Sequence, residues 1–194
     1  MFLFFHTNAV GKPKSWKAPY TDTFAWPRMI QLAWQLYDKT GLLKEKASHI
    51  IYPEGFDIPY DSERFHQIST ERARGEGTDL EEVLREFKSK IDVAEYVVAH
   101  NWNLDANVVA AEFERKDISQ TLFSSEFFSL MAESTYYCKL PGKYGKYKWP
   151  TLSELHAKVF GARFEDPYNS EVAVQALANC FFALVRKEEI DLFE

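Results

Sequence analysis

The spacing of apolar and polar residues predicts that the chain opens with three strands. Residues 2–6 form an apolar run that leads into a Gly-Lys-Pro loop, which indicates a short buried strand. Residues 28–37 alternate between apolar and polar side chains, as a half-buried strand does. A turn at residues 38–41 and a second alternating run through residues 48–52 complete the pattern of an antiparallel hairpin.

Helices alternate with a further strand in the rest of the chain. Residues 78–90 begin with a capping-box-like sequence and carry apolar side chains three or four positions apart, which predicts an amphipathic helix. Residues 96–99 indicate a buried strand, and a helix capped by Asn103 or a neighbour follows it. A Gly/Pro-interrupted loop over residues 139–150 precedes two more helices. These are expected over residues 151–160 and 170–187.

Chain length and the N-terminal run bound the class of protein. At 194 residues the chain has the size of one domain, so residues 1–194 are expected to form a single unit with a continuous core. The apolar run at the N-terminus is too short for a signal peptide or a membrane span. We therefore expect a cytoplasmic protein without a membrane partner. Cys138 and Cys180 belong to no C-x-x-C pair and are expected to be reduced core residues.

The charge balance restricts how the chain could bind nucleic acid. A formal net charge of −6 argues against a sequence-independent nucleic-acid coat, which needs a basic surface to release counterions. Two lysine-bearing loops could still form a local basic groove, because lysines with interleaved aromatic residues suit phosphate contact and base stacking. The alternative is that these lysines only keep solvated loops soluble. The candidate residues are Lys12, Lys14, Trp16, Lys17, Lys143, Tyr144, Lys146 and Tyr147.

Three local sequences resemble the motifs of a known enzyme family. Residues 3–11 (LFFHTNAVG) are similar to a strand followed by Asp-Thr-Glu-Thr-Thr-Gly, and residues 98–101 (VAHN) followed by Asp105 match a second motif. Residues 155–173 keep the frame of a third motif. The chain thus resembles the DEDDh-type 3′-5′ exonucleases of the ribonuclease H-like superfamily, similar to the proofreading epsilon subunit. The resemblance implies an α/β fold with a mixed central sheet of about five strands flanked by helices, with residues 2–6 as a central strand.

The resemblance also implies a chemistry whose residues are mostly absent here. The family hydrolyses phosphodiesters with two Mg²⁺ or Mn²⁺ ions, which four carboxylates hold while a histidine acts as general base. The five matching positions in this chain are His6, Asn8, Asp105, Tyr168 and Ala173. Asp105 is the one retained carboxylate, so the site is degenerate. The five positions are nevertheless expected to converge in one cleft, because the motif frames match.

One carboxylate is a poor holder of paired divalent ions. A divalent ion about 4 Å from a carboxylate gains roughly 8 kcal/mol at an effective dielectric of about 20, and three such partners are missing. No cofactor is therefore expected. A weak single-metal site formed by Asp105 with His6 and Asn8 stays open as an alternative. Asp105 also has a structural interpretation, because the helix dipole favours a carboxylate in the first turn.

The function expected from these observations is binding without hydrolysis. The partner would be a single-stranded nucleic-acid 3′ end or another protein. Two alternatives remain: a divergent but active metal-dependent 3′-5′ exonuclease, and a structural scaffold that forms a homodimer. His100 and Asn101 are expected to shape the loop after the fourth strand by hydrogen bonding and to contribute to the nucleic-acid-binding surface. His66 is expected to be an ordinary surface or turn histidine, and Glu171 to point away from the cleft.

Overall fold

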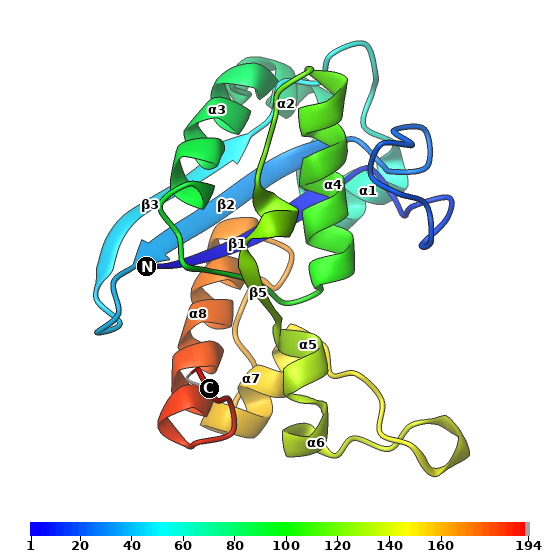
Figure 1. Cartoon of the computed structure of the whole chain (residues 1–194). Helices are drawn as coiled ribbons and strands as arrows, with labels where there is room; N and C mark the ends of the chain where they lie inside the picture. The colour runs from blue at the N-terminus through cyan, green and yellow to red at the C-terminus, as the bar shows by residue number, and fades with distance from the viewer. Residues whose placement is uncertain (193–194) are drawn as a thin grey trace.

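The computed structural model describes residues 1–192 and shows a five-stranded mixed sheet between two layers of helices (Figure 1). The strands are β1 (Phe2–Ala9), β2 (Met29–Tyr37), β3 (Leu43–Ile50), β4 (Tyr96–Ala99) and β5 (Glu126–Ser129). Their order is β3-β2-β1-β4-β5, so the N-terminal strand is central. The predicted α/β fold and sheet are confirmed. The last two residues of the predicted 1–194 domain lie outside the described residues.

The central strand has neighbours that run in opposite directions. β1 pairs antiparallel with β2 and parallel with β4, while β3 and β5 form the two edges. Because successive side chains of a strand point to opposite faces, β1 contributes Leu3 and Phe5 to one face and Phe2 and Phe4 to the other. This explains why residues 2–5 are apolar without alternation: both faces of the central strand are covered.

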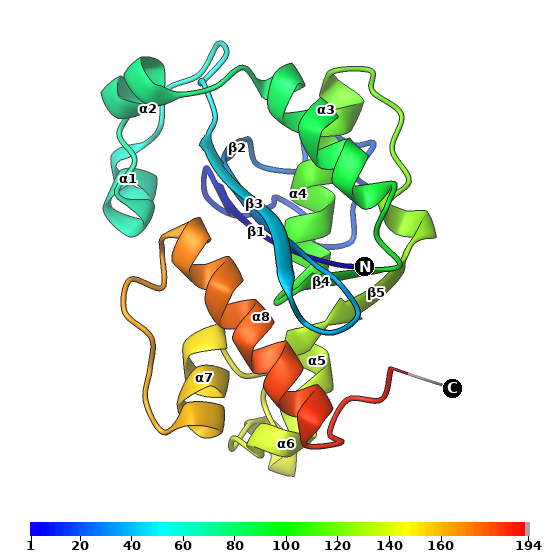
Figure 2. The same ribbon diagram turned by 90° about the vertical axis from the view of Figure 1, so that its left-hand side faces the viewer.

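Helices cover both faces of the sheet. The longer ones are α3 (Leu80–Ile91), α4 (Trp102–Arg115), α7 (Leu152–Phe160) and α8 (Ser170–Arg186). The shorter ones are α1 (Tyr60–His66), α2 (Thr70–Glu76), α5 (Leu130–Glu133), α6 (Thr135–Cys138), and the 3₁₀ turns η1 (Leu122–Ser124) and η2 (Lys143–Gly145). Figure 2 shows α3 and α4 on one side of the sheet and α8 and α7 on the other. Each layer has its own core, one around Phe5 and Phe87 and one around Phe4 and Phe181.

Local sequence signals set most helix ends. The Thr151 side chain caps α7 in a reciprocal capping box with Glu154, and Gly161 ends this helix in the left-handed conformation. The cap of α3 is Asp79, which accepts from the backbone of Glu82, so the helix begins two residues after Thr78. The cap of α4 is Asn101 rather than Asn103. The predicted helices are therefore confirmed with shifts of one or two residues at their ends.

Several elements differ from the sequence-based expectations. β1 extends beyond residue 6 to Ala9, and β3 covers Leu43–Ile50 rather than ending near Tyr52. The pattern gave no signal for α1, α2, α5, α6 or β5. The four helices have only four to seven residues, too few for a helical period to stand out, and β5 begins with Glu and ends with Ser, without the apolar run that marked β4. β5 forms because β4 offers a parallel partner to Glu126–Ser129.

The cysteine prediction is confirmed, since Cys138 and Cys180 are both free and buried. Burial raises the pKa of the Cys180 thiol to about 12, which keeps it protonated and unreactive. Within the described part of the chain, no helix has the length and apolar character needed to cross a membrane.

Candidate functional site

His6 and Asn8 lie two residues apart on β1 and share the face of the sheet that α8 covers. The Nδ1 atom of His6 lies 3.0 Å from Oγ of Ser170, the first residue of α8. The side-chain amide of Asn8 donates to the backbone carbonyl of Tyr168 over 2.7 Å. The segment that begins α8 therefore engages both side chains.

A buried glutamine on β2 extends this contact across the sheet. Asn8 and Gln31 are paired residues, and the Asn8 amide donates to Oε1 of Gln31 over 3.0 Å. The same oxygen accepts from the backbone N–H of Ser170 at 3.3 Å. Asn8, Gln31 and Ser170 are only 6%, 8% and 0% exposed. We call Asn8, Gln31, Ser170 and the Tyr168 carbonyl the polar clamp, because buried hydrogen bonds join the start of α8 to β1 and β2.

Asp105 forms hydrogen bonds with the backbone and the side chain of Thr7, which lies between His6 and Asn8 on β1. Its Oδ1 atom accepts from the Thr7 N–H at 2.9 Å and from the Thr7 hydroxyl at 2.8 Å. The carboxyl is 3% exposed, and burial raises its pKa, although His6 and the Thr7 hydrogen bonds act in the opposite direction. Burial also lowers the pKa of His6, with Asp105 opposing that shift. Both shifts favour the neutral forms of these two groups.

His100 and Asn101 shape the connection from β4 to α4. Asn101 caps α4 by accepting from Leu104 N–H, and Nε2 of His100 lies 3.0 Å from the carbonyl oxygen of Pro150. Burial lowers the pKa of His100 to about 4. Its Nδ1 atom is buried without a hydrogen-bond partner among the described residues. His100 thereby fastens the end of the 139–150 segment beside the site.

Tyr168 and Ala173 occupy their expected places in the chain without offering polar side chains to the site. The Tyr168 ring packs on Phe65 of α1 at a centroid distance of 4.2 Å. Ala173 is buried in the core that contains Phe4. Glu171 is exposed and lies 3.4 Å from Lys46 on β3, away from the core, as its helical position predicts.

The side chains present here do not fit a pair of hard divalent ions. Such ions require several oxygen ligands, whereas Asp105 is the single acid among the five positions and its Oδ1 atom already accepts from Thr7. Across residues 1–192, no three His, Cys, Asp or Glu side chains are grouped so that they could hold a metal ion. His6 is directed to Ser170 instead.

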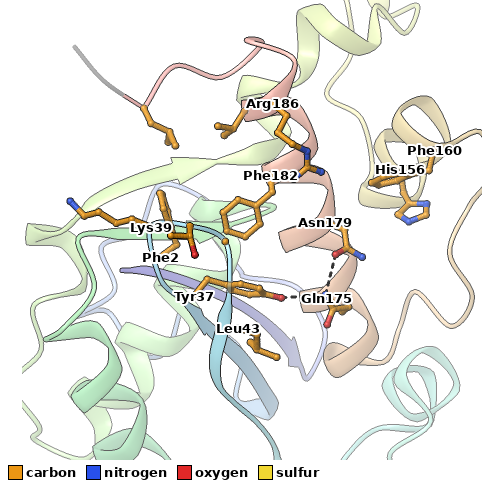
Figure 3. Close-up of a pocket in the computed structure, with 14 residues that line it drawn as sticks. Phe2, Tyr37, Lys39, Leu43, His156, Phe160, Gln175, Asn179, Phe182 and Arg186 are labelled. Atoms are coloured by element: carbon orange, nitrogen blue, oxygen red, sulfur yellow. Dashed lines mark hydrogen bonds between the residues drawn. The ribbon is translucent and has the colours of Figure 1, made fainter.

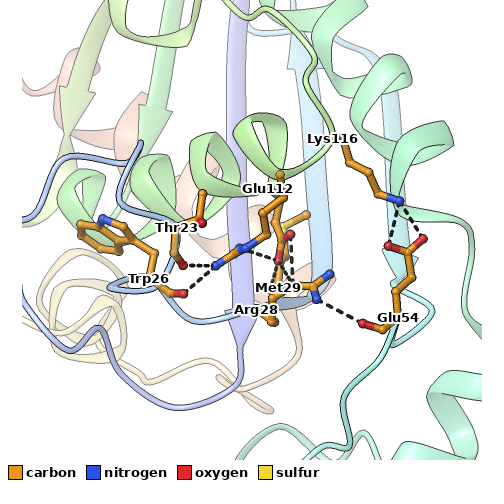
Figure 4. Close-up of polar contacts among 8 residues, drawn as sticks. Thr23, Trp26, Arg28, Met29, Glu54, Glu112 and Lys116 are labelled. Carbon is orange, nitrogen blue, oxygen red and sulfur yellow. Dashed lines mark hydrogen bonds and ion pairs between the residues drawn. The ribbon is translucent and has the colours of Figure 1, made fainter.

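A buried ion network fixes the loop between β1 and β2 (residues 10–28), as Figure 4 shows. Glu112 of α4 is fully buried and lies 3.0 Å from Arg28 and 3.1 Å from Arg115. The Arg115 guanidinium in turn donates to the backbone carbonyl of Trp26 over 2.8 Å. Removing one partner of a buried charge is costly, so this network holds the C-terminal end of the loop on α4.

Two surface segments flank the site, and both extend from the right-hand side of the molecule in Figure 1. One is the loop of residues 10–28, which begins two residues after Asn8. The other, which we call the lysine hairpin, is residues 139–150, and its end contacts His100. Most basic residues on β3, α2 and α3 form ion pairs. In contrast, these lysines form none with any described residue: Lys12, Lys14, Lys17, Lys139, Lys143 and Lys146.

The lysine hairpin is a tight turn that presents aromatic rings. Gly142 N–H donates to the Lys146 carbonyl, and Lys148 N–H donates to the Leu140 carbonyl. A Cβ atom on Gly142 would lie 2.6 Å from that Lys146 oxygen, so the close approach of the two backbones requires glycine. Tyr144 has a φ of 57° and is 97% exposed. A bulky residue with this backbone conformation stores strain, and such strain is found disproportionately at ligand-binding positions.

Sequence reasoning missed two aromatic residues and the clamp partners. Trp149 and Tyr136 are 64% and 76% exposed, and the Tyr136 ring contacts Tyr147. Trp149 lies within the predicted loop, so its aromatic side chain could have been recognised from the sequence as a candidate for base stacking. Gln31 was one polar position of the alternating pattern that suggested a half-buried strand, but both faces of β2 are buried, and nothing local to Ser170 indicated a contact with His6.

A separate groove lies beside α8, between this helix and the turn that joins β2 to β3 (Figure 3). It has a volume of about 850 Å³, and Phe182, Gln175 and Leu43 are among its lining residues. Gln175 donates to the Tyr37 hydroxyl and to Asn179 across its floor. The five positions that match the exonuclease motifs are not among the residues that line it.

The fold is similar to that of solved exonuclease structures. Its mixed five-stranded sheet, flanked by helices, matches solved structures of E. coli exonuclease I. A complex with single-stranded DNA in a zinc-bound form has a TM-score of 0.73 and 16% identity over 96% of this chain. A complex with a dT13 oligonucleotide has a TM-score of 0.74 and 16% identity over 95% of this chain. A complex with a dA16 oligonucleotide has a TM-score of 0.74 and 17% identity over 96%.

The likeness concerns the fold alone, because these identities are low. The chain spans about 40% of the length of the exonuclease I structures. No family model matches the sequence, and no curated protein is significantly similar to it.

Proposed function

We propose that this chain binds single-stranded nucleic acid through the 10–28 loop and the lysine hairpin and does not hydrolyse it. The observation that carries the proposal is the pairing of two lysine-rich, aromatic segments around a site whose acidic ligands are replaced. The solved structures with the same fold hold single-stranded DNA, which supports this class of ligand.

The unpaired lysines support the binding part of the proposal. A lysine without an acidic neighbour is available to a phosphate, and each neutralised phosphate releases counterions. Trp16, Tyr144, Tyr147 and Trp149 supply exposed rings, and base stacking contributes about 1–3 kcal/mol per base. Because the chain carries a net charge of −6, the attraction must be local to these two segments.

Oligonucleotide binding tests this part directly. We expect a fluorescently labelled single strand to bind at low salt, with an affinity that falls steeply as salt rises. A double variant, Lys143→Ala with Lys146→Ala, should reduce the affinity and lower the salt slope by about 1 to 2. Lys158→Ala with Arg163→Ala removes two exposed charges elsewhere and is the matched control, with no change expected. Absence of binding by the unmodified chain would favour a protein partner.

The metal ligands that the side chains at the site can offer support the absence of hydrolysis. With Asp105 bound to Thr7 and Asn8 bound to Tyr168, the site lacks the carboxylates that paired Mg²⁺ or Mn²⁺ ions need. We expect no shortening of a labelled oligonucleotide with either metal during prolonged incubation. Enzymes reach rate enhancements of at least about 10⁶-fold, so even a weak nuclease would be seen. Digestion abolished by Asp105→Ala would instead identify a divergent active exonuclease.

A further inference from the structure

The place where a chain end would enter the site is closed by the protein's own groups. His6 contacts the Ser170 hydroxyl, Asn8 donates to both Gln31 and the Tyr168 carbonyl, and Asp105 accepts twice from Thr7. Ser170 is fully buried and Asn8 nearly so. Any polar ligand group that entered here would first have to break these hydrogen bonds.

The groups at the site also offer no positive charge to a nucleotide phosphate. A phosphate that entered would approach Oδ1 of Asp105 and the carbonyl oxygen of Tyr168, which both act as acceptors here and give an anion no hydrogen-bond donor. His6 is the basic group nearest to Asp105 at these positions, and it is engaged with Ser170. Breaking the clamp without a compensating cation leaves buried donors and acceptors unsatisfied, and each costs about 1–3 kcal/mol.

The attractive groups lie outside the site and on both sides of it. Lys12, Lys14 and Trp16 follow β1, while Lys143 and Tyr144 lie in the hairpin whose end is held by His100. Both segments are largely exposed, and their lysines other than Lys148, which pairs with Glu154, lack ion-pair partners among the described residues. A strand that contacts both segments would therefore pass over the closed site.

We propose that the chain binds internal segments of single strands and that a free 3′ end takes no part in recognition. This proposal rests on the function proposed above and specifies its ligand. It predicts a continuous strand that contacts the 10–28 loop and the lysine hairpin through its phosphates and bases, with no terminal nucleotide inserted between β1 and the start of α8.

Competition between linear and circular single strands tests this proposal. A linear DNA oligonucleotide with a 3′ hydroxyl, the same oligonucleotide with a bulky 3′ block, and a covalently closed circle of the same sequence are compared as ligands. We expect their dissociation constants to agree within about twofold, well below the tenfold that 1.4 kcal/mol represents. A circle that binds at least about tenfold more weakly than the linear strand would overturn the proposal.

A hairpin variant separates failure of this inference from failure of the proposed function. Tyr144→Ala should weaken linear and circular ligands by the same factor, about tenfold if one base stacks on the ring. Loss of linear binding alone would place the 3′ end in the complex and reject the inference, while the proposed function would survive. If none of the three oligonucleotides binds at low salt, both the inference and the proposed function are wrong.

Discussion

At the scale of single residues, the difference between an amide and a carboxylate decides what the end of β1 does. The Asn8 amide donates two hydrogen bonds, to Gln31 and to the Tyr168 carbonyl. A carboxylate at this position accepts only, so it would face two oxygen atoms with nothing to donate. The amide at position 8 therefore makes a structural contact that a carboxylate could not make.

Asn8→Asp tests this contact with almost no change in shape. We expect the free energy of unfolding to fall by about 2–4 kcal/mol at pH 7, because a buried charge loses its hydrogen-bond partners. Urea denaturation measures it. Asn179→Asp is the matched control: Asn179 is exposed on α8 and uses its oxygen as acceptor, so its variant should stay within about 0.5 kcal/mol. Equal stability of the Asn8 variant and the unmodified chain would contradict the clamp.

At the scale of elements, the lysine hairpin and the 10–28 loop are held in different ways. The loop is fastened by the buried Glu112 network, whereas the hairpin depends on its own backbone hydrogen bonds and on the contact of Pro150 with His100. The hairpin contributes no residue between 141 and 149 to the buried cores. Its conformation can therefore change with little effect on the rest of the fold.

Gly142→Ala should separate hairpin shape from global stability. The added Cβ would meet backbone atoms of Lys146 and Lys148, which cannot move without opening the turn. We expect faster tryptic cleavage at Lys143 and Lys146 and weaker oligonucleotide binding, with a melting temperature within a few degrees of the unmodified chain. Gly75→Ala in α2, where a Cβ has open space, should alter neither cleavage nor binding. Unchanged cleavage and binding in the Gly142 variant would show that the turn tolerates the methyl group.

At the scale of the whole molecule, buried neutral histidines make stability depend on pH. Burial lowers the pKa of His66 and of His100 to about 4, and it also lowers that of His6. His66 is thus a buried residue rather than the surface or turn histidine that the sequence suggested: its Nδ1 accepts from the Ile68 N–H, and its Nε2 has no partner among the described atoms. Unfolding exposes these rings, which then take up protons with a pKa near 6.5.

The sign of the pH dependence follows from these shifts. The unfolded chain binds more protons than the folded chain between about pH 6.5 and pH 4. The contribution of these histidines to the free energy of unfolding is therefore fully present above pH 6.5 and is lost as the pH falls from 6.5 to 4. Between pH 7 and pH 5, His66 and His100 should each lower the free energy of unfolding by about 2 kcal/mol. The raised pKa of Asp105 acts in the opposite direction and reduces the total.

Denaturation curves at several pH values measure this effect. His66→Asn keeps an acceptor near the Nδ1 position, and His100→Gln keeps a donor near the Nε2 position. Below pH 6.5, the slope of the free energy of unfolding against pH should decrease in each variant by the contribution of about one bound proton. A decline of unchanged steepness in both variants would assign the acid sensitivity to other groups.

The sequence by itself determined the central strand, the hairpin, the long helices and the local caps. These follow from periods and end signals within about 15 residues, such as the Thr151 and Glu154 capping box. It also determined which residue types stand at the five positions of the exonuclease resemblance, of which Asp105 is the one carboxylate. The roles of these positions stay proposals.

Only the tertiary structure decided which partners the side chains at those positions contact. His6 and Ser170 are in contact although they are 164 residues apart in the sequence, and Gln31 and Ser170 are 139 apart. No local sequence pattern indicates contacts at such separations. The short β5 likewise exists because β4 lies beside it. Periodicity records which face of an element is buried, but the partner of a buried polar group is chosen by packing between elements, which is a property of the folded chain as a whole.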